Sequence, residues 1–98
     1  MTALETRLDL LAASGETITY GDLARELGLR MGELTTALEA LMEQDAAEGH
    51  PFRAALCAGR INDGLPATGF FLKAAELGRY DGGDRGAYIT AERAALRR

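Results

Sequence analysis

The stretch ITYGDLARELGLRMGELTTALEALMEQDAAEG, residues 18–49, decides the fold that this sequence predicts. Its apolar residues recur with helical spacing on both sides of a short break at Gly28-Leu29-Arg30. Thr19 can cap the first of the two helices, because a threonine hydroxyl accepts a hydrogen bond from a free backbone N–H of the first turn. Gly28 can end that helix, since glycine adopts the left-handed conformation without strain. The stretch therefore predicts two helices joined by a tight turn.

The apolar positions of this helix pair and of its flanking segments predict one shared core. The expected members are Leu8, Leu11, Ile18, Leu23, Leu27, Leu34, Leu38, Leu41, Leu56 and Phe70. A chain of 98 residues has room for one such core, which indicates a single domain.

The segment before the helix pair predicts a first helix and a short extended piece. Thr2 and Glu5 have the spacing of a capping box, and Gly15 can end the helix that they begin. Residues 16–19 include Thr17, Ile18 and Thr19, which favour an extended backbone.

The segment after the helix pair is harder to interpret. Residues 53–61 are small and apolar, and we expect a buried strand there, followed by a turn at Asp63-Gly64. A helix is expected from Thr68 to about Gly78. Residues 81–86 predict a flexible link, and residues 91–97 a short helix capped by Thr90. The expected organisation is a domain at 1–80, followed by a link and short helix at 81–98.

The charge is unevenly distributed along the chain. Residues 1–50 carry a net charge of −7 and residues 51–98 carry +3, which gives the total of −4. The two halves can attract each other, within one molecule or between two. The sequence does not predict the oligomeric state.

Composition excludes several kinds of site. A single cysteine cannot form an internal disulfide, and one cysteine with one histidine is too few for an ordinary zinc site. The N-terminus has no basic start followed by an apolar run, and no apolar run approaches membrane-spanning length. We therefore expect a cytoplasmic protein with no metal, no cofactor and no membrane contact.

The order helix, short strand, helix-turn-helix, strand with turn, helix resembles a winged helix, in which a small sheet leans on three helices. The stretch HPFRAALCAGRINDGLPATGFFLKAAELG, residues 50–78, is similar to that of small bacterial winged-helix proteins of no assigned activity. The resemblance implies a mainly helical α+β fold, classed as winged-helix-like, and no catalytic residues.

A second resemblance concerns TYGDLA, residues 19–24, which is similar to the start of the helix-turn-helix in alkylguanine-DNA alkyltransferases. Those proteins carry a reactive cysteine in a Pro-Cys-His-Arg motif after the helix pair. The comparable run here is Leu56-Cys57-Ala58-Gly59-Arg60, which lacks the proline and the histidine. Histidine would lower the pKa of the thiol, so Cys57 has no adjacent activator. We interpret Cys57 as a packed core residue and expect no enzyme, with an alkyltransferase-like repair protein as the weakest alternative.

The leading hypothesis is a DNA-binding or transcription-associated module of weak intrinsic specificity, and protein binding is the alternative. A helix-turn-helix places its second helix in the major groove, yet residues 31–49 contain no lysine or arginine. The candidate DNA contacts are Arg25, Arg30, Thr35, Thr36, Arg53 and Arg60. In the alternative, the module binds a protein partner through its acidic second helix, with Glu33, Glu39 and Glu43 as contacts.

Three further features have plainer interpretations. We interpret the acidic residues of the second helix, Asp45 and Glu48 included, as a solvated face. Phe70 and Phe71 are expected to be a core aromatic pair, and His50 to help end a helix.

Overall fold

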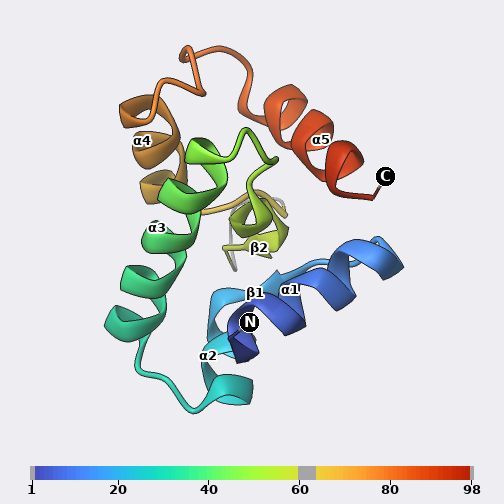
Figure 1. The fold of residues 1–98 in the computed structure, drawn as a ribbon, viewed down its shortest axis with the longest axis vertical. Coiled ribbons are helices and arrows are strands. Elements are labelled where there is room, and N and C mark those ends of the chain that lie inside the picture. The colour runs from blue at the N-terminus through green and yellow to red at the C-terminus, as the bar shows by residue number, and fades with distance from the viewer. Residues whose placement is uncertain (1, 60–63, 98) are drawn as a thin grey trace.

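The computed structural model describes residues 2–59 and 64–97 and has a mainly helical α+β fold (Figure 1). Its elements are α1 (Ala3–Ser14), β1 (Ile18–Thr19), α2 (Tyr20–Leu27), α3 (Met31–Ala47), the 3-10 helix η1 (Arg53–Leu56), β2 (Cys57–Ala58), α4 (Thr68–Glu76) and α5 (Arg85–Leu96). Figure 1 shows η1 and β2 in the middle of the molecule, with α3 on one side and α5 on the other. The 3-10 helix contacts α1, α3 and α5, so it is the hub of the packing.

The predicted helix pair is confirmed as α2 and α3. The Thr19 hydroxyl accepts a hydrogen bond from the backbone N–H of Asp22 at 3.2 Å, as expected of a cap. Gly28 has φ +68°, and its N–H donates to the carbonyl of Arg25. The Glu33 carboxylate accepts from the N–H of Arg30 at 2.8 Å and so caps the start of α3.

The first helix is also confirmed. Thr2 and Glu5 form the reciprocal capping box, and Gly15 ends α1 with φ +73°. Residues 18 and 19 are extended, as predicted, and form β1.

The predicted strand over residues 53–61 is wrong for its first four residues. Residues 53–56 form η1, and within the described residues 53–59 the strand is limited to Cys57 and Ala58. They pair in parallel with β1, Ile18 opposite Cys57 and Thr19 opposite Ala58. A short apolar run has no periodicity that separates a buried strand from a buried helical turn, so the sequence pattern was ambiguous. The expected turn at Asp63-Gly64 and the end of the strand lie at least partly outside the described residues.

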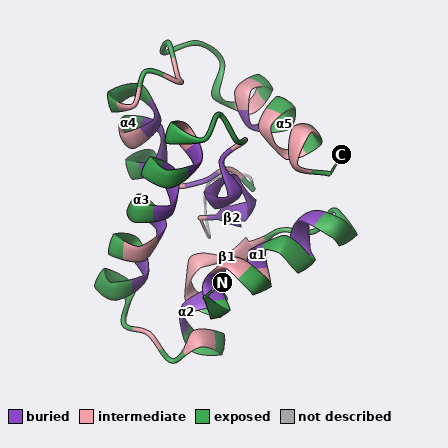
Figure 2. Cartoon of the chain, in the orientation of Figure 1, coloured by how far each residue is buried: buried purple, intermediate pink, exposed green. Residues whose placement is uncertain are grey.

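The predicted core is confirmed. Eight of its members are buried, while Ile18 and Leu27 are partly buried and pack against it. Figure 2 shows buried residues along the inner sides of α1 and α3 and throughout η1. Phe70 and Phe71 pack edge to face, with ring centroids 5.3 Å apart, which confirms the aromatic pair.

The C-terminal segment differs from its prediction. Helix α5 begins at Arg85, and its cap is Asp84, whose carboxylate accepts from the N–H of Ala87 at 3.0 Å. The expected start at residue 91 is therefore wrong, and so is the expected link at residues 85 and 86. Ile89 on α5 is 1% exposed and belongs to the core, so this helix is part of the domain.

Candidate functional site

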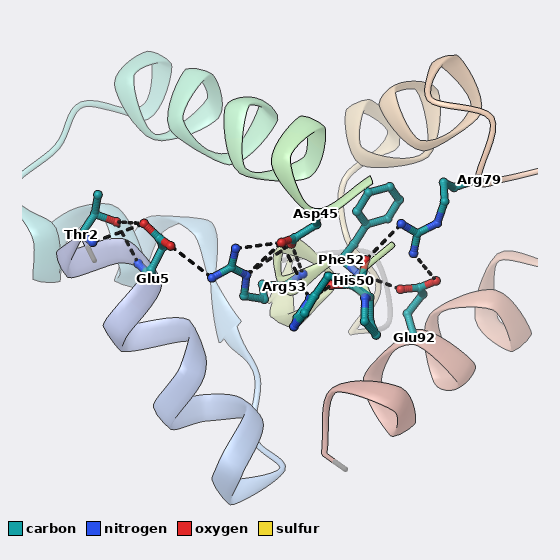
Figure 3. Close-up of polar contacts among 9 residues, drawn as sticks. Thr2, Glu5, Asp45, His50, Phe52, Arg53, Arg79 and Glu92 are labelled. Carbon is teal, nitrogen blue, oxygen red and sulfur yellow. Dashed lines mark hydrogen bonds and ion pairs between the residues drawn. The ribbon is translucent and has the colours of Figure 1, made fainter. Parts of the chain in front are cut away.

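A buried ion pair joins the end of α3 to η1 (Figure 3). Arg53, at the start of η1, places Nη2 2.7 Å and Nε 3.1 Å from Oδ1 of Asp45 on α3. The backbone N–H of Arg53 donates to the other carboxylate oxygen at 3.0 Å. On the opposite side, Arg53 Nη1 donates to Glu5 Oε2 at 3.2 Å. The guanidinium thus joins α1, α3 and η1.

This geometry decides the roles of two residues. Asp45 is fully buried and Arg53 is 8% exposed, so the interpretation of Asp45 as part of a solvated face is wrong. The hydrogen bond to Asp45 raises the pKa of Arg53, and hydrogen bonds from Thr2 and then Arg53 lower the pKa of Glu5. A guanidinium buried between two carboxylates is not placed to contact a phosphate. The geometry therefore contradicts the predicted DNA contact of Arg53.

A second polar cluster attaches α5 to the hub. Glu92 accepts hydrogen bonds from the N–H of Phe52 at 2.9 Å and from Arg79 Nη2 at 3.4 Å. Arg79 Nη1 donates to the carbonyl of His50 at 3.0 Å, and the Arg79 guanidinium lies 4.2 Å from the centroid of the Phe52 ring. The His50 ring lies 2.7 Å from the Pro51 carbonyl through Nδ1. The backbone N–H of His50 donates to the carbonyl of Asp45 at 2.8 Å, which places His50 at the end of α3.

Cys57 lies in an environment that suppresses thiol chemistry. Its side chain is fully buried, and burial raises the pKa of the Cys57 thiol to about 12. Arg93 opposes this shift but donates its own hydrogen bonds to the carbonyls of Ala55 and Gly64, each at 2.8 Å. Since the thiolate is the reactive form, this geometry gives Cys57 no means of acting as a nucleophile.

Four of the predicted DNA contacts are exposed, and they lie in sequence on either side of the turn between α2 and α3. They are Arg25, Arg30, Thr35 and Thr36. Arg25 forms an ion pair with Asp22, and the two threonine hydroxyls donate to the carbonyls of Met31 and Gly32 one turn earlier. The sixth candidate, Arg60, lies outside the described residues.

The acidic face of α3 is exposed at Glu33, Glu39, Glu43 and Glu48. Glu43 accepts a hydrogen bond from Lys73 Nζ of α4 at 2.6 Å, while its side chain stays 58% exposed. Together with the pairs that Arg53 makes, this contact shows how the acidic first half and the basic second half attract each other within one molecule.

An apolar groove of about 320 Å³ lies between this face of α3 and the start of α4. It is lined by Tyr20, Met31, Thr35, Leu38, Glu39, Met42, Ala54, Ala67, Gly69 and Phe70. Sequence reasoning missed the groove. The signal was present in Met31, Thr35, Leu38 and Met42, which recur at helical spacing and extend the core stripe of α3 to an exposed methionine.

A second hollow of about 430 Å³ lies on another side of α3, against α1 and the end of α2. Across residues 2–59 and 64–97, no group of three or more His, Cys, Asp or Glu side chains is placed to hold a metal ion. No helix in that part of the chain is long and apolar enough to cross a membrane. Comparison with protein-family models, with characterised proteins and with solved structures finds no match for this chain.

Proposed function

We propose that this chain is a non-enzymatic protein-interaction module of winged-helix-like architecture, with the outer face of α3 as its contact surface. The observation that carries the proposal is the distribution of unpaired charge. Most cationic side chains in the described part of the chain are already bound within the molecule, whereas carboxylates of α3 face solvent.

The cations are engaged in several ways. Arg53, Lys73 and Arg79 pair with carboxylates, and Arg85 lies 4.7 Å from the centroid of the Phe71 ring. Arg93 donates to backbone carbonyls. Phosphate contacts supply most non-specific affinity for DNA, and they need cations that are free to reach the backbone. Intramolecular pairing leaves few of them for that task and favours a partner that is not a polyanion.

Three further observations support the proposal. The short two-stranded sheet and the α2–α3 helix pair support the winged-helix-like part of the proposal. The burial of Cys57 supports a module without alkyl-transfer chemistry. A contact surface on α3 also agrees with the exposure of Glu33, Glu39 and Glu43.

DNA binding remains a second candidate, because Arg25, Arg30, Thr35 and Thr36 are all exposed and flank the turn between α2 and α3 in sequence. We expect it to be weak and non-specific, with a dissociation constant in the range of about 10⁻⁴ to 10⁻⁶ M at physiological salt. The exposed carboxylates of α3 would repel the duplex over distances within the Debye length of about 8 Å.

The experiment that tests the proposal combines two measurements on the whole chain. A photo-crosslinking amino acid at position 39, in cells that produce the protein, should give a discrete protein adduct. The same group at position 10, where Leu10 is 60% exposed on α1, should not. A salt-series titration with mixed-sequence duplex DNA should give only weak binding. Submicromolar DNA affinity at physiological salt, or adducts of equal yield at both positions, would overturn the proposal.

A further inference from the structure

The groove between α3 and α4 is apolar at its base and narrow enough to hold side chains. Leu38, Met42, Ala54 and Phe70 form its base, and each is at most 6% exposed. The start of α4 contributes little bulk, because Gly69 has no side chain and a Cβ built there meets no atom within 4 Å. This missing bulk leaves the space of about 320 Å³ open beside α3.

The shape of the groove follows one stripe of α3. Met31, Thr35, Leu38 and Met42 line it, and from the first to the last the helix rises by about 16 Å, or three turns. Grooves of this kind beside a helix accept amphipathic helices, whose apolar side chains recur at positions i, i+3, i+4 and i+7. Met31 at one end is 50% exposed, and methionine adapts its shape to apolar partners.

The charge beside the groove selects the partner. Glu39 is exposed on the rim, and the adjoining cluster contains Glu43, Glu76 and Lys73. Three carboxylates against one ammonium leave this side negative. At the opposite end the groove is lined by Met31, which the exposed Arg30 precedes in the chain. An occupant with basic residues beside its apolar stripe would complement the charge on the Glu39 side of the groove. Its less basic end would then lie near Arg30.

We propose that this groove binds a basic amphipathic helix of a partner protein, with its apolar stripe seated between α3 and α4. The inference rests on the proposed function and specifies the partner that the α3 face takes. The apolar contacts supply most of the affinity, and the carboxylates around Glu39 select against acidic helices.

The probe for the test is a synthetic capped peptide of about 16 residues, long enough to form helix on binding. It carries leucines on one face, lysines beside them and alanines elsewhere. Two control peptides replace the lysines by glutamate, or scramble the order so that the leucines share no face. Backbone amide shifts of the isotope-labelled full-length chain report the site. We expect the basic peptide to shift residues along the groove, and both control peptides to bind at least about ten-fold more weakly.

Matched variants locate the contact. Gly69→Leu places bulk in the groove, and Ala75→Leu places the same side chain on an exposed position of the same helix. Only Gly69→Leu should weaken the binding of the basic peptide, with a dissociation constant that rises by more than about ten-fold. Glu39→Gln should lower the affinity for the peptide by about two- to five-fold, the range of an exposed ion pair. Glu48→Gln, at the C-cap of α3, should leave the affinity unchanged. The amide spectra of the free variants check that the fold is retained.

The outcomes separate this inference from the proposed function. Shifts confined to the hollow between α1 and α3, equal binding of the acidic peptide, or no effect of Gly69→Leu would each overturn the groove as a basic-helix site. If crosslinks from position 39 persist in Gly69→Leu, the interaction module stands while the groove assignment fails. Duplex DNA that displaces the peptide from the groove residues would also overturn the inference.

Discussion

Asp45 and Arg53 form a buried ion pair across the turn that ends α3, with Arg53 Nη2 2.7 Å from Asp45 Oδ1. The chain between them reverses at Gly49, which has φ +66°, and the N–H of His50 donates to the Asp45 carbonyl at 2.8 Å. The carboxylate therefore binds both the side chain and the backbone N–H of Arg53. This relationship fixes the position of η1, on which the rest of the fold packs.

The first prediction concerns this pair. Asp45→Ala leaves the buried guanidinium with only Glu5 as an ionic partner, and we expect it to lower the free energy of unfolding by about 3–5 kcal/mol. Urea denaturation at pH 7 measures the change. Glu48→Ala, at an exposed position at the end of the same helix, is the control and should stay within about 0.5 kcal/mol of the parent. A loss below about 1 kcal/mol for Asp45→Ala would contradict a structural role for the pair.

The second prediction concerns alkaline pH. Burial raises the pKa of the Cys57 thiol from 9.0 to about 12 in the folded state, so folding favours the protonated thiol. Its contribution to stability is fully present below pH 9 and is lost as the pH rises towards 12. Burial also raises the pKa of Tyr20 and Tyr88 to about 12, from an ordinary value of 10.0. The contributions of the two tyrosines to stability therefore begin to fall only above pH 10, whereas that of Cys57 begins to fall at pH 9.

The measurement is the free energy of unfolding between pH 8 and pH 10. The stability of the parent should fall across this range, and Cys57→Ala should show a shallower fall, because the thiol titrates first in the unfolded chain. Identical pH profiles for the two proteins would contradict the assignment of this fall to Cys57.

The third prediction concerns the reactivity of the same thiol. Native Cys57 should react slowly with thiol reagents at neutral pH, because it is fully buried and remains protonated. The rate should rise with urea in proportion to the unfolded fraction. Fast modification of the folded protein, or alkyl transfer from modified DNA to Cys57, would instead support the alkyltransferase alternative.

The fourth prediction concerns α5. A chain that ends at Tyr80 lacks Ile89, which belongs to the core. It also lacks Glu92, whose carboxylate accepts a hydrogen bond from the backbone N–H of Phe52. We expect this truncated chain to lose its cooperative unfolding transition. In the full chain, Ile89→Ala should cost about 2–5 kcal/mol. A stable, cooperatively folding chain of residues 1–80 would restore the domain boundary predicted from the sequence.

The local signals of this chain determined its helices. The capping box of Thr2 and Glu5, the Thr19 cap and the left-handed glycines at positions 15 and 28 all act within a few residues. Their effects can be predicted because a helix end satisfies its free N–H and C=O groups with near neighbours. The periodic leucines likewise identified the core, since burial follows helical spacing.

The tertiary structure alone decided the rest. Asp45 continues the helical spacing of Leu34, Leu38 and Leu41, which places it on the buried face of α3. Only the return of the chain as η1 supplies Arg53 as the partner of its carboxylate. Helix α5 begins at the local cap of Asp84, but the burial of Ile89 in the core depends on contacts with distant parts of the chain, η1 among the elements that α5 contacts. The groove exists because Gly69 of α4 lies beside Met31 to Met42 of α3, far away in the sequence. Helical spacing indicates which face of a segment is buried, but it does not say which distant segment packs against that face. The sequence pattern therefore predicted the elements, and the packing decided the site.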